Sequence, residues 1–251
     1  MGQTLAEKIL SRKVGRPVRA GEMVICPVDV ALTQDGTGPL AVRQLQKLNM
    51  VRAACPGRTV LFIDHAAPSP RKELSNDHML LREFARETGC VLSDVGAGVC
   101  HQIIAEEYAR PGDVIIGADS HTVTAGALGA FATGMGSTDV AMGIALGKTW
   151  FRVPETFQIR VRGRFSPGVG AKDLILHLIG RLGADGATYK ALEFVGETIE
   201  EMPMTDRLTL SNMAVEAGAK VGLIPSDEET RRYLAAMGRE GDWQPLAPDA
   251  D

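Results

Sequence analysis

The sequence predicts an α/β protein: a first domain with a mainly parallel sheet between two layers of helices, and a smaller second α/β domain. Two observations predict this. Between Thr37 and Ala145, short apolar runs rich in β-branched residues alternate with helical patterns of about ten to fifteen residues. These runs are apolar at successive positions, which is typical of strands buried on both faces of a parallel sheet. Near residue 153 the pattern changes, so we place the domains at residues 1–153 and 154–251.

The first domain is expected to begin with a helix. Thr4 and Glu7 have the spacing of a capping box, and Gly15 is placed to end that helix. The periodicity then predicts helices over 39–49, 75–88, 100–109 and 138–148, and strands over 59–63, 91–95 and 114–116.

The second domain is expected to begin with a strand that is exposed on one face. Phe157, Ile159 and Val161 alternate there with polar residues. A helix over 171–182, a strand over 189–195 and a helix over 205–217 follow. A last helix should begin at the capping box of Ser226 and Glu229, and the segment from 243 onward has the composition of a linker.

Composition excludes several classes of function. The net charge of −4 is spread without long runs of one sign, which is unlike the basic stripe of a nucleic-acid-binding protein. No apolar stretch approaches the ~20 residues that span a bilayer, and no signal peptide precedes the first helix, so we expect a cytoplasmic protein. The four cysteines lack metal-ligand spacing and are expected to be free thiols, with Cys90 and Cys100 buried.

Three polar stretches follow predicted strands, at the edge where ligands bind in open α/β sheets. They are Asp64-His65, Cys100-His101 and Asp119-Ser120-His121. A histidine beside a carboxylate can act as an acid or base near neutral pH, and three of the five histidines belong to these stretches. His78, in the first turn of a helix, is expected to be solvated, and His177 is expected to be structural.

Two further features have both a functional and a structural interpretation. Asn212 and Glu216 are spaced i,i+4 and share one helix face, which is a solvated face in the structural interpretation. The glycine-rich stretch 33–39 leads into a helix with Pro39 at its first position. It is either a site for a substrate carboxylate or an ordinary helix start.

Five motifs occur in order: TQDGTGPL, FIDH, GVCHQ, GADSHT and LSNMAVEAGA. As a set they resemble the large subunits of the aconitase superfamily, especially the bacterial and archaeal branch of 3-isopropylmalate dehydratase and homoaconitase. The likeness runs from the first helix to about Ser226. It implies a hydro-lyase that isomerises a hydroxy di- or tricarboxylic acid by dehydration and rehydration, with 2-isopropylmalate of leucine biosynthesis as the first substrate to consider. In this family a 4Fe–4S cluster acts as Lewis acid.

The matching motifs imply a role for each residue. Asp64 and His65 would protonate the leaving hydroxyl, while His101 and Asp119 would hold the hydroxyl or water. His121 and Glu216 would form a second pair near the cluster. Gln34 and Ser120 would bind a substrate carboxylate, and Asn212 would support the cluster.

The cysteines depart from the family pattern. The family's three cluster thiolates lie in a third domain, and none of the four cysteines here has their sequence context. We therefore expect only the first two domains, with no metal ligand of the cluster among them. The resemblance implies three partners: that third domain, a small subunit and a small carboxylic acid. The small subunit would carry the swivelling domain with the serine base and the substrate arginines. The chain alone would therefore be inactive.

Three alternatives remain open from the sequence. The enzyme could be a homoaconitase or aconitase. A cluster-free metallohydrolase could use Asp64, His65, His101, Asp119 and His121 on zinc or a two-metal centre. A non-catalytic module could bind only a partner subunit.

Overall fold

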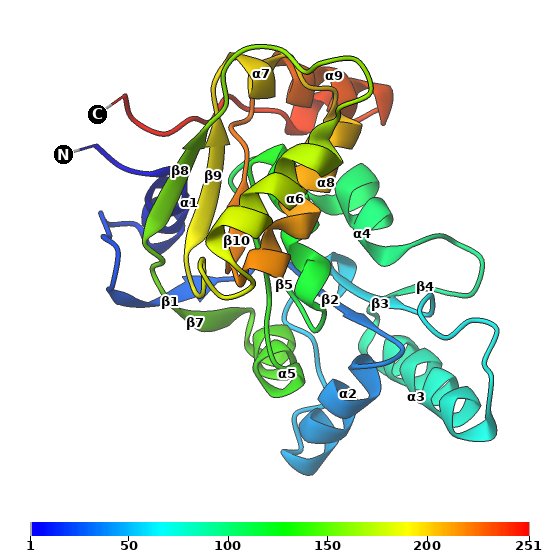
Figure 1. Cartoon of the computed structure of the whole chain (residues 1–251). Helices are drawn as coiled ribbons and strands as arrows, with labels where there is room; N and C mark the ends of the chain where they lie inside the picture. The colour runs from blue at the N-terminus through cyan, green and yellow to red at the C-terminus, as the bar shows by residue number, and fades with distance from the viewer. Residues whose placement is uncertain (1, 251) are drawn as a thin grey trace.

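A computed structural model describes residues 2–250 of the chain (Figure 1). Its main sheet has five parallel strands in the order β4-β3-β2-β5-β6. These are β2 (Val30–Gln34), β3 (Thr59–Phe62), β4 (Val91–Ser93), β5 (Val114–Gly117) and β6 (Phe131–Gly134). The predicted parallel α/β fold is confirmed, although β2 and β6 were not predicted.

Helices cover both faces of this sheet. On one face α1 (Leu5–Val14), α2 (Gly38–Lys47), α3 (Lys72–Thr88) and α5 (Ser137–Leu146) share a core with Ala31, Leu61 and Ile116. The other face packs against α4 (Cys100–Ile103), the π-helical turn η2 (Ile104–Tyr108), the 3-10 helix η3 (Ser120–Leu128), α8 (Met204–Met213) and α9 (Glu228–Ala236). Alternate residues of each strand therefore enter different cores. The capping box of Thr4 and Glu7 and the left-handed Gly15 bound α1 as predicted.

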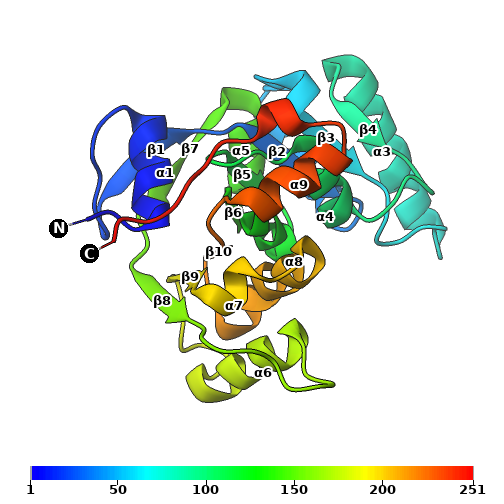
Figure 2. The same cartoon turned by 90° about the horizontal axis from the view of Figure 1, so that it is seen from above.

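The second sheet has three parallel strands in the order β10-β9-β8. They are β8 (Thr156–Arg160), β9 (Ala191–Val195) and β10 (Val221–Leu223), with α6 (Ala171–Leu182) on the outside and α7 (Glu197–Glu200) near one end (Figure 2). Two unpredicted strands, β1 (Met23–Pro27) and β7 (Lys148–Arg152), form an antiparallel pair. Val221 and Leu223 belong to the same core as β5, so the division near residue 153 stays a prediction.

Two glycines bring the second sheet against η3. A Cβ on Gly126 would lie 1.9 Å from the carbonyl oxygen of Gly222, and the amide of Ile224 donates to Gly126 O at 3.0 Å. No side chain larger than hydrogen fits at 126 without moving the backbone. This close approach sets the position of α8 and the following 3-10 turn η4 (Ala214–Ala217) relative to η3.

The C-terminal segment is packed, so the predicted linker was wrong. Leu246 is 3% exposed and forms a β-bridge with Ser226. Ser226 Oγ donates to the carbonyl of Gln244, and Asp227, not Ser226, caps α9. Both carboxylate oxygens of Asp227 also accept from the buried Arg207 at 2.7 Å. The short elements η1 (Pro56–Arg58) and η5 (Glu240–Asp242) complete the described chain.

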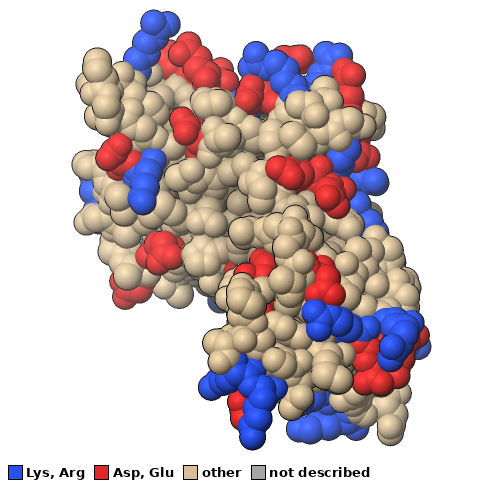
Figure 3. Space-filling view, turned by 90° about the vertical axis from the view of Figure 1, so that its right-hand side faces the viewer, with Lys and Arg blue, Asp and Glu red and all other residues tan. Residues whose placement is uncertain are grey.

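The charge visible in Figure 3 does not indicate a nucleic-acid partner. On the face shown in Figure 3, acidic and basic side chains are interspersed. Within residues 2–250, no helix combines the length and apolar character needed to cross a membrane.

Candidate active site

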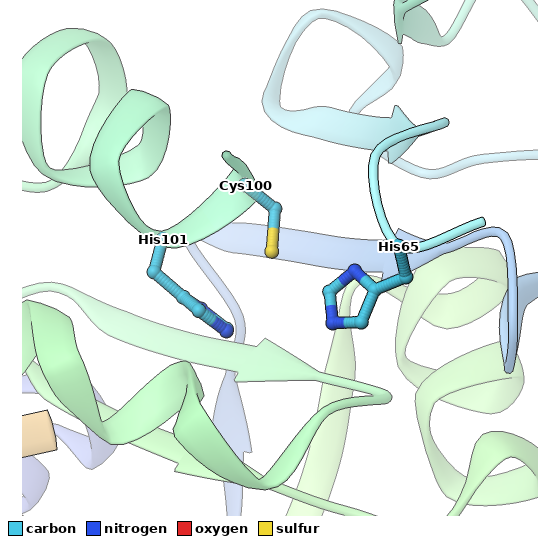
Figure 4. Close-up of side chains that lie close together, drawn as sticks. All are labelled: His65, Cys100 and His101. Atoms are coloured by element: carbon cyan, nitrogen blue, oxygen red, sulfur yellow. The ribbon is translucent and has the colours of Figure 1, made fainter. Parts of the chain in front are cut away.

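The polar stretches singled out from the sequence meet at one edge of the main sheet. β3, β2 and β5 are neighbours, and their carboxyl ends lead directly to Asp64-His65, Gln34 and Asp119. His101 comes from the first turn of α4, and its ring faces the same space as His65 (Figure 4). Parallel strands end at the same edge, so this convergence follows from the topology.

Asp119 is the centre of the cluster. Its Oδ1 accepts from the backbone amide of His121 at 2.8 Å and lies 3.1 Å from His101 Nε2. Its Oδ2 lies 3.2 Å from His65 Nε2 and accepts from Gln34 Nε2 at 3.3 Å. Burial alone would raise the pKa of Asp119, but the hydrogen bond and charge of His101, with the other donors, hold it well below its usual range. Asp119 is therefore a fixed negative charge.

His65 lies between two carboxylates. Its Nδ1 is 2.8 Å from Asp64 Oδ1, while its Nε2 faces Asp119. A protonated ring can donate from Nδ1 to Asp64 while Nε2 lies within ion-pair distance of Asp119. Burial lowers the pKa of His65, but the hydrogen bond and charge of Asp64 and the charges of Asp119 and Asp35 outweigh it, and the pKa is raised. The ring is 39% exposed and so remains accessible to a ligand.

His121 forms the second imidazole–carboxylate pair. Its Nε2 lies 3.2 Å from Glu216 Oε1, and its ring centroid is 6.0 Å from that of His101. Asn212 Nδ2 donates to Thr124 Oγ1 at 2.8 Å, and this hydroxyl donates to the backbone carbonyl of His121 at 2.6 Å. The predicted single helix ends at Met213, so Asn212 lies in the last turn of α8 and Glu216 in the 3-10 turn η4, yet both side chains contact η3. Asn212 supports the backbone that presents His121.

A cavity of about 410 Å³ adjoins this cluster. Asp119 and Ser120 form one wall, and Gly134, Val215 and Lys220 line others. The Ser120 hydroxyl is exposed and lies 3.4 Å from His121 Nδ1. The volume is within the usual range for small-molecule sites.

Both the oxygen and the nitrogen of the Gln34 side-chain amide form hydrogen bonds within the chain. Its Oε1 accepts from the amide of Gly36, and its Nε2 donates to Asp119. The side chain is 6% exposed. The structure thus gives it a positioning role beside Asp119, and contact with a substrate carboxylate stays a prediction.

Asp35 and His78 form a buried pair that the sequence analysis missed. The expectation that His78 is solvated was wrong, because its side chain is 4% exposed and its Nε2 lies 3.0 Å from Asp35 Oδ2. Asp35 also accepts from the backbone amides of His65 and Ala66 at 2.9 and 2.8 Å. The pair therefore holds the backbone that presents His65. Its partners are 43 residues apart, so no local pattern reveals it.

The possible metal donors near the site are mainly imidazoles and carboxylates. Three groups have ligand atoms within 4.8 Å of one another: His65, Cys100 and His101; His101, Asp119 and His121; Asp35, Asp64 and His65. Within residues 2–250, no such group contains more than one thiol. Burial first, and the nearby Asp64 charge second, raise the pKa of the Cys100 thiol and keep it protonated. Cys26, Cys90 and Cys100 are buried and Cys55 is exposed; all four are free.

Comparison with known proteins gives one family. The model of the aconitase family (aconitate hydratase) matches residues 7–249. The large subunit of 3-isopropylmalate dehydratase from Elusimicrobium minutum is 65% identical over 249 residues, which are 99% of this chain and 60% of the relative. Large subunit 1 from Thermotoga maritima is 58% identical over 251 residues, and large subunit 2 from Archaeoglobus fulgidus is 57% identical over 252, each across 100% of this chain. The chain spans about 60% of the length of these relatives.

Proposed function

The chain belongs to the aconitase family, and from this premise we propose that it forms one wall of the active site of a hydro-lyase. The reaction is the interconversion of 2- and 3-isopropylmalate by dehydration and rehydration, as the names of the relatives suggest. The observation that supports this best is the convergence of His65, His101 and the His121 backbone on the single carboxylate of Asp119.

His65 is the group we assign to the leaving hydroxyl. Held as an imidazolium between Asp64 and Asp119, it can give a proton to the hydroxyl oxygen while the C–O bond breaks, so that water leaves. In the hydration direction the neutral ring takes a proton back from the attacking water. The neighbouring carbon must lose a proton in the same dehydration, and we assign that base to a partner subunit.

The remaining residues position the ligand and the water. We assign His101 and Asp119 to the hydroxyl or water, and His121 with Glu216 to a second proton-transfer pair. Ser120 faces the cavity and is assigned to a substrate carboxylate, with Gln34 behind Asp119. Asn212 acts through Thr124 on the His121 backbone and is a positioning residue.

The family uses a 4Fe–4S cluster, and the donors described in this chain do not fit one. A cluster of this kind needs several thiolates, whereas the ligand groups near the site hold one protonated thiol, that of Cys100. We propose that the cluster ligands belong to the part of the relatives that this chain does not span, and that a small subunit completes the site. We derive no step through the cluster.

A chimaeric enzyme tests this function. This chain replaces the matching 60% of the Elusimicrobium minutum large subunit, to which it is 65% identical, and is co-expressed with that organism's small subunit. We expect conversion of 2-isopropylmalate by the chimaera and none by the isolated, iron-free chain. A folded chimaera that turns over only homocitrate or citrate contradicts the substrate, and turnover by the isolated chain contradicts the whole proposal.

A metallohydrolase is the second candidate, favoured by the ligand group of His101, Asp119 and His121. These are suitable zinc ligands. Stoichiometric zinc in the purified chain, together with zinc-dependent hydrolase activity, would replace the first proposal by this one.

A further inference from the structure

Lys220 lines the cavity beside Asp119 and Ser120, and no motif pointed to it. It lies between the turn η4 and strand β10, and η3 and the end of β6 provide the other walls. The cavity of about 410 Å³ exceeds the space of a few water molecules, because one water occupies about 30 Å³ in the liquid. It can therefore hold a small organic acid.

The ammonium of Lys220 is half-buried without a counter-ion. Its Nζ donates to the carbonyl of Gly134 at 3.0 Å and lies 5.6 Å from the ring centroid of Tyr189. Among residues 2–250 no carboxylate lies within ion-pair distance of it; Asp139 acts only through its more distant charge. Burial lowers the pKa of the ammonium. An ammonium has three N–H donors, so two remain for a ligand.

Gly134 places this ammonium close to Ser120. A Cβ on Gly134 would lie 2.8 Å from the Cα of Ser120 and 2.6 Å from the carbonyl oxygen of Asp119. The end of β6 therefore packs directly on the backbone of Asp119 and Ser120, while its carbonyl holds Lys220. A hydroxyl and an ammonium thus face one cavity from neighbouring segments.

We propose that Lys220 and Ser120 form a carboxylate subsite in this cavity. The carboxylate is one of the two on the hydroxy acid of the proposed function, on which this inference rests, and it supplies the missing counter-ion. Val123, Met135 and Val215 line the same cavity and give the pair partly apolar surroundings. An ion pair in such surroundings is screened less than one on the open surface.

Binding to the purified 251-residue chain tests the subsite. Calorimetric titrations use two probes, 2-isopropylmalate and succinate, which has two carboxylates and no hydroxyl. We expect Lys220→Met to weaken binding of both about tenfold, because a charge-assisted hydrogen bond is lost, and Lys220→Arg to stay within about threefold of wild type. Lys172→Met, on the exposed side of α6, is the matched control and should bind like wild type.

The outcomes separate the subsite from the proposed function. Binding of 2-isopropylmalate that is unchanged in Lys220→Met overturns the subsite and leaves the function standing. Binding of succinate alone, lost in Lys220→Met, supports the subsite and contradicts the substrate. If wild type binds neither probe, the subsite is overturned. Thermal unfolding of each variant confirms that it is folded.

Discussion

Asp35 and Asp119 each hold imidazoles and backbone amides, but of these two carboxylates Asp119 lines the cavity described above and Asp35 does not. Asp35 is fully buried, and its partner His78 is 4% exposed. Asp119 receives a similar set of donors, yet two of the imidazoles around it, His65 and His121, are 39% and 38% exposed. The same pair of groups is therefore structural in one place and available for chemistry in the other.

The difference lies in what remains open around each carboxylate. Asp35 accepts two amides and one imidazole from within the chain, and it does not line the cavity beside Asp119. Around Asp119, the cavity and the exposed imidazole edges leave room for a hydroxyl and a proton acceptor. An imidazole beside a carboxylate thus indicates a candidate site only when solvent or a ligand can reach the ring.

The largest expected effect is the loss of turnover in Asp119→Asn. In the chimaeric enzyme we expect kcat for 2-isopropylmalate to fall about a thousandfold, because the charge that holds the imidazoles of His65 and His101 is removed. The measurement is the rate of formation of the unsaturated intermediate. Asp185→Asn, at an exposed turn, is the control. A variant with wild-type kcat would place the chemistry elsewhere.

The second effect is on stability and concerns the buried pair of Asp35 and His78. Asp35→Ala should lower the free energy of unfolding by about 3 kcal/mol, because it leaves His78 buried without its partner. Urea unfolding of the isolated chain measures this, and Asp185→Ala should stay within about 0.5 kcal/mol of wild type. If Asp35→Ala keeps the wild-type free energy of unfolding, the Asp35–His78 pair does not have the structural role assigned to it.

A smaller effect is expected at Asn212, which supports the backbone of His121 near Asp119. Asn212→Ala removes the hydrogen bond to Thr124 and should cost about 1 kcal/mol in unfolding free energy. In the chimaera it should also reduce kcat, since the His121 backbone loses support. Asn76→Ala, exposed on α3, is the control. Loss of stability without any change in kcat would limit Asn212 to a structural role.

The smallest effect is a pH dependence that reports His65. Its raised pKa means that the folded state binds the proton more tightly, so its contribution to stability is present below the ordinary value of 6.5 and is lost as pH rises through the folded pKa. The stability difference between wild type and His65→Gln should therefore shrink on moving from about pH 6 to about pH 9. The ring is more than one-third exposed, so water screens the effect. Asp64→Asn should lower the pKa of His65, as measured by NMR titration; an unchanged pKa contradicts the assignment.

The regular parts of the fold were predictable because their signals are local. Buried parallel strands such as β3 and β5 are apolar at successive positions, and α1 carries its own capping residues. Strand β2 was missed although all its residues are buried, because Thr33 and Gln34 at its end resemble a polar loop. Ser226 was mistaken for a helix cap because its true partner, Leu246, is distant in sequence.

The site was predictable to the extent that strand ends mark it. Asp64, His65, His101 and Asp119 follow or adjoin strands of one parallel sheet, and the topology brings them together. Asp35, His78 and Lys220 gain their importance only from burial and from partners far along the chain. A single lysine or a histidine in a helix has no sequence pattern that distinguishes these cases.

The contact between Gly126 and Gly222 constrains how such a chain can recombine with its relatives. The two backbones touch with no room for a Cβ, and across this contact η3 presents His121 while the turn after α8 presents Glu216. A crossover between positions 126 and 222 would bring together two contact surfaces that come from different parents. Chimaeras that take both positions from one parent should retain the His121–Glu216 pair.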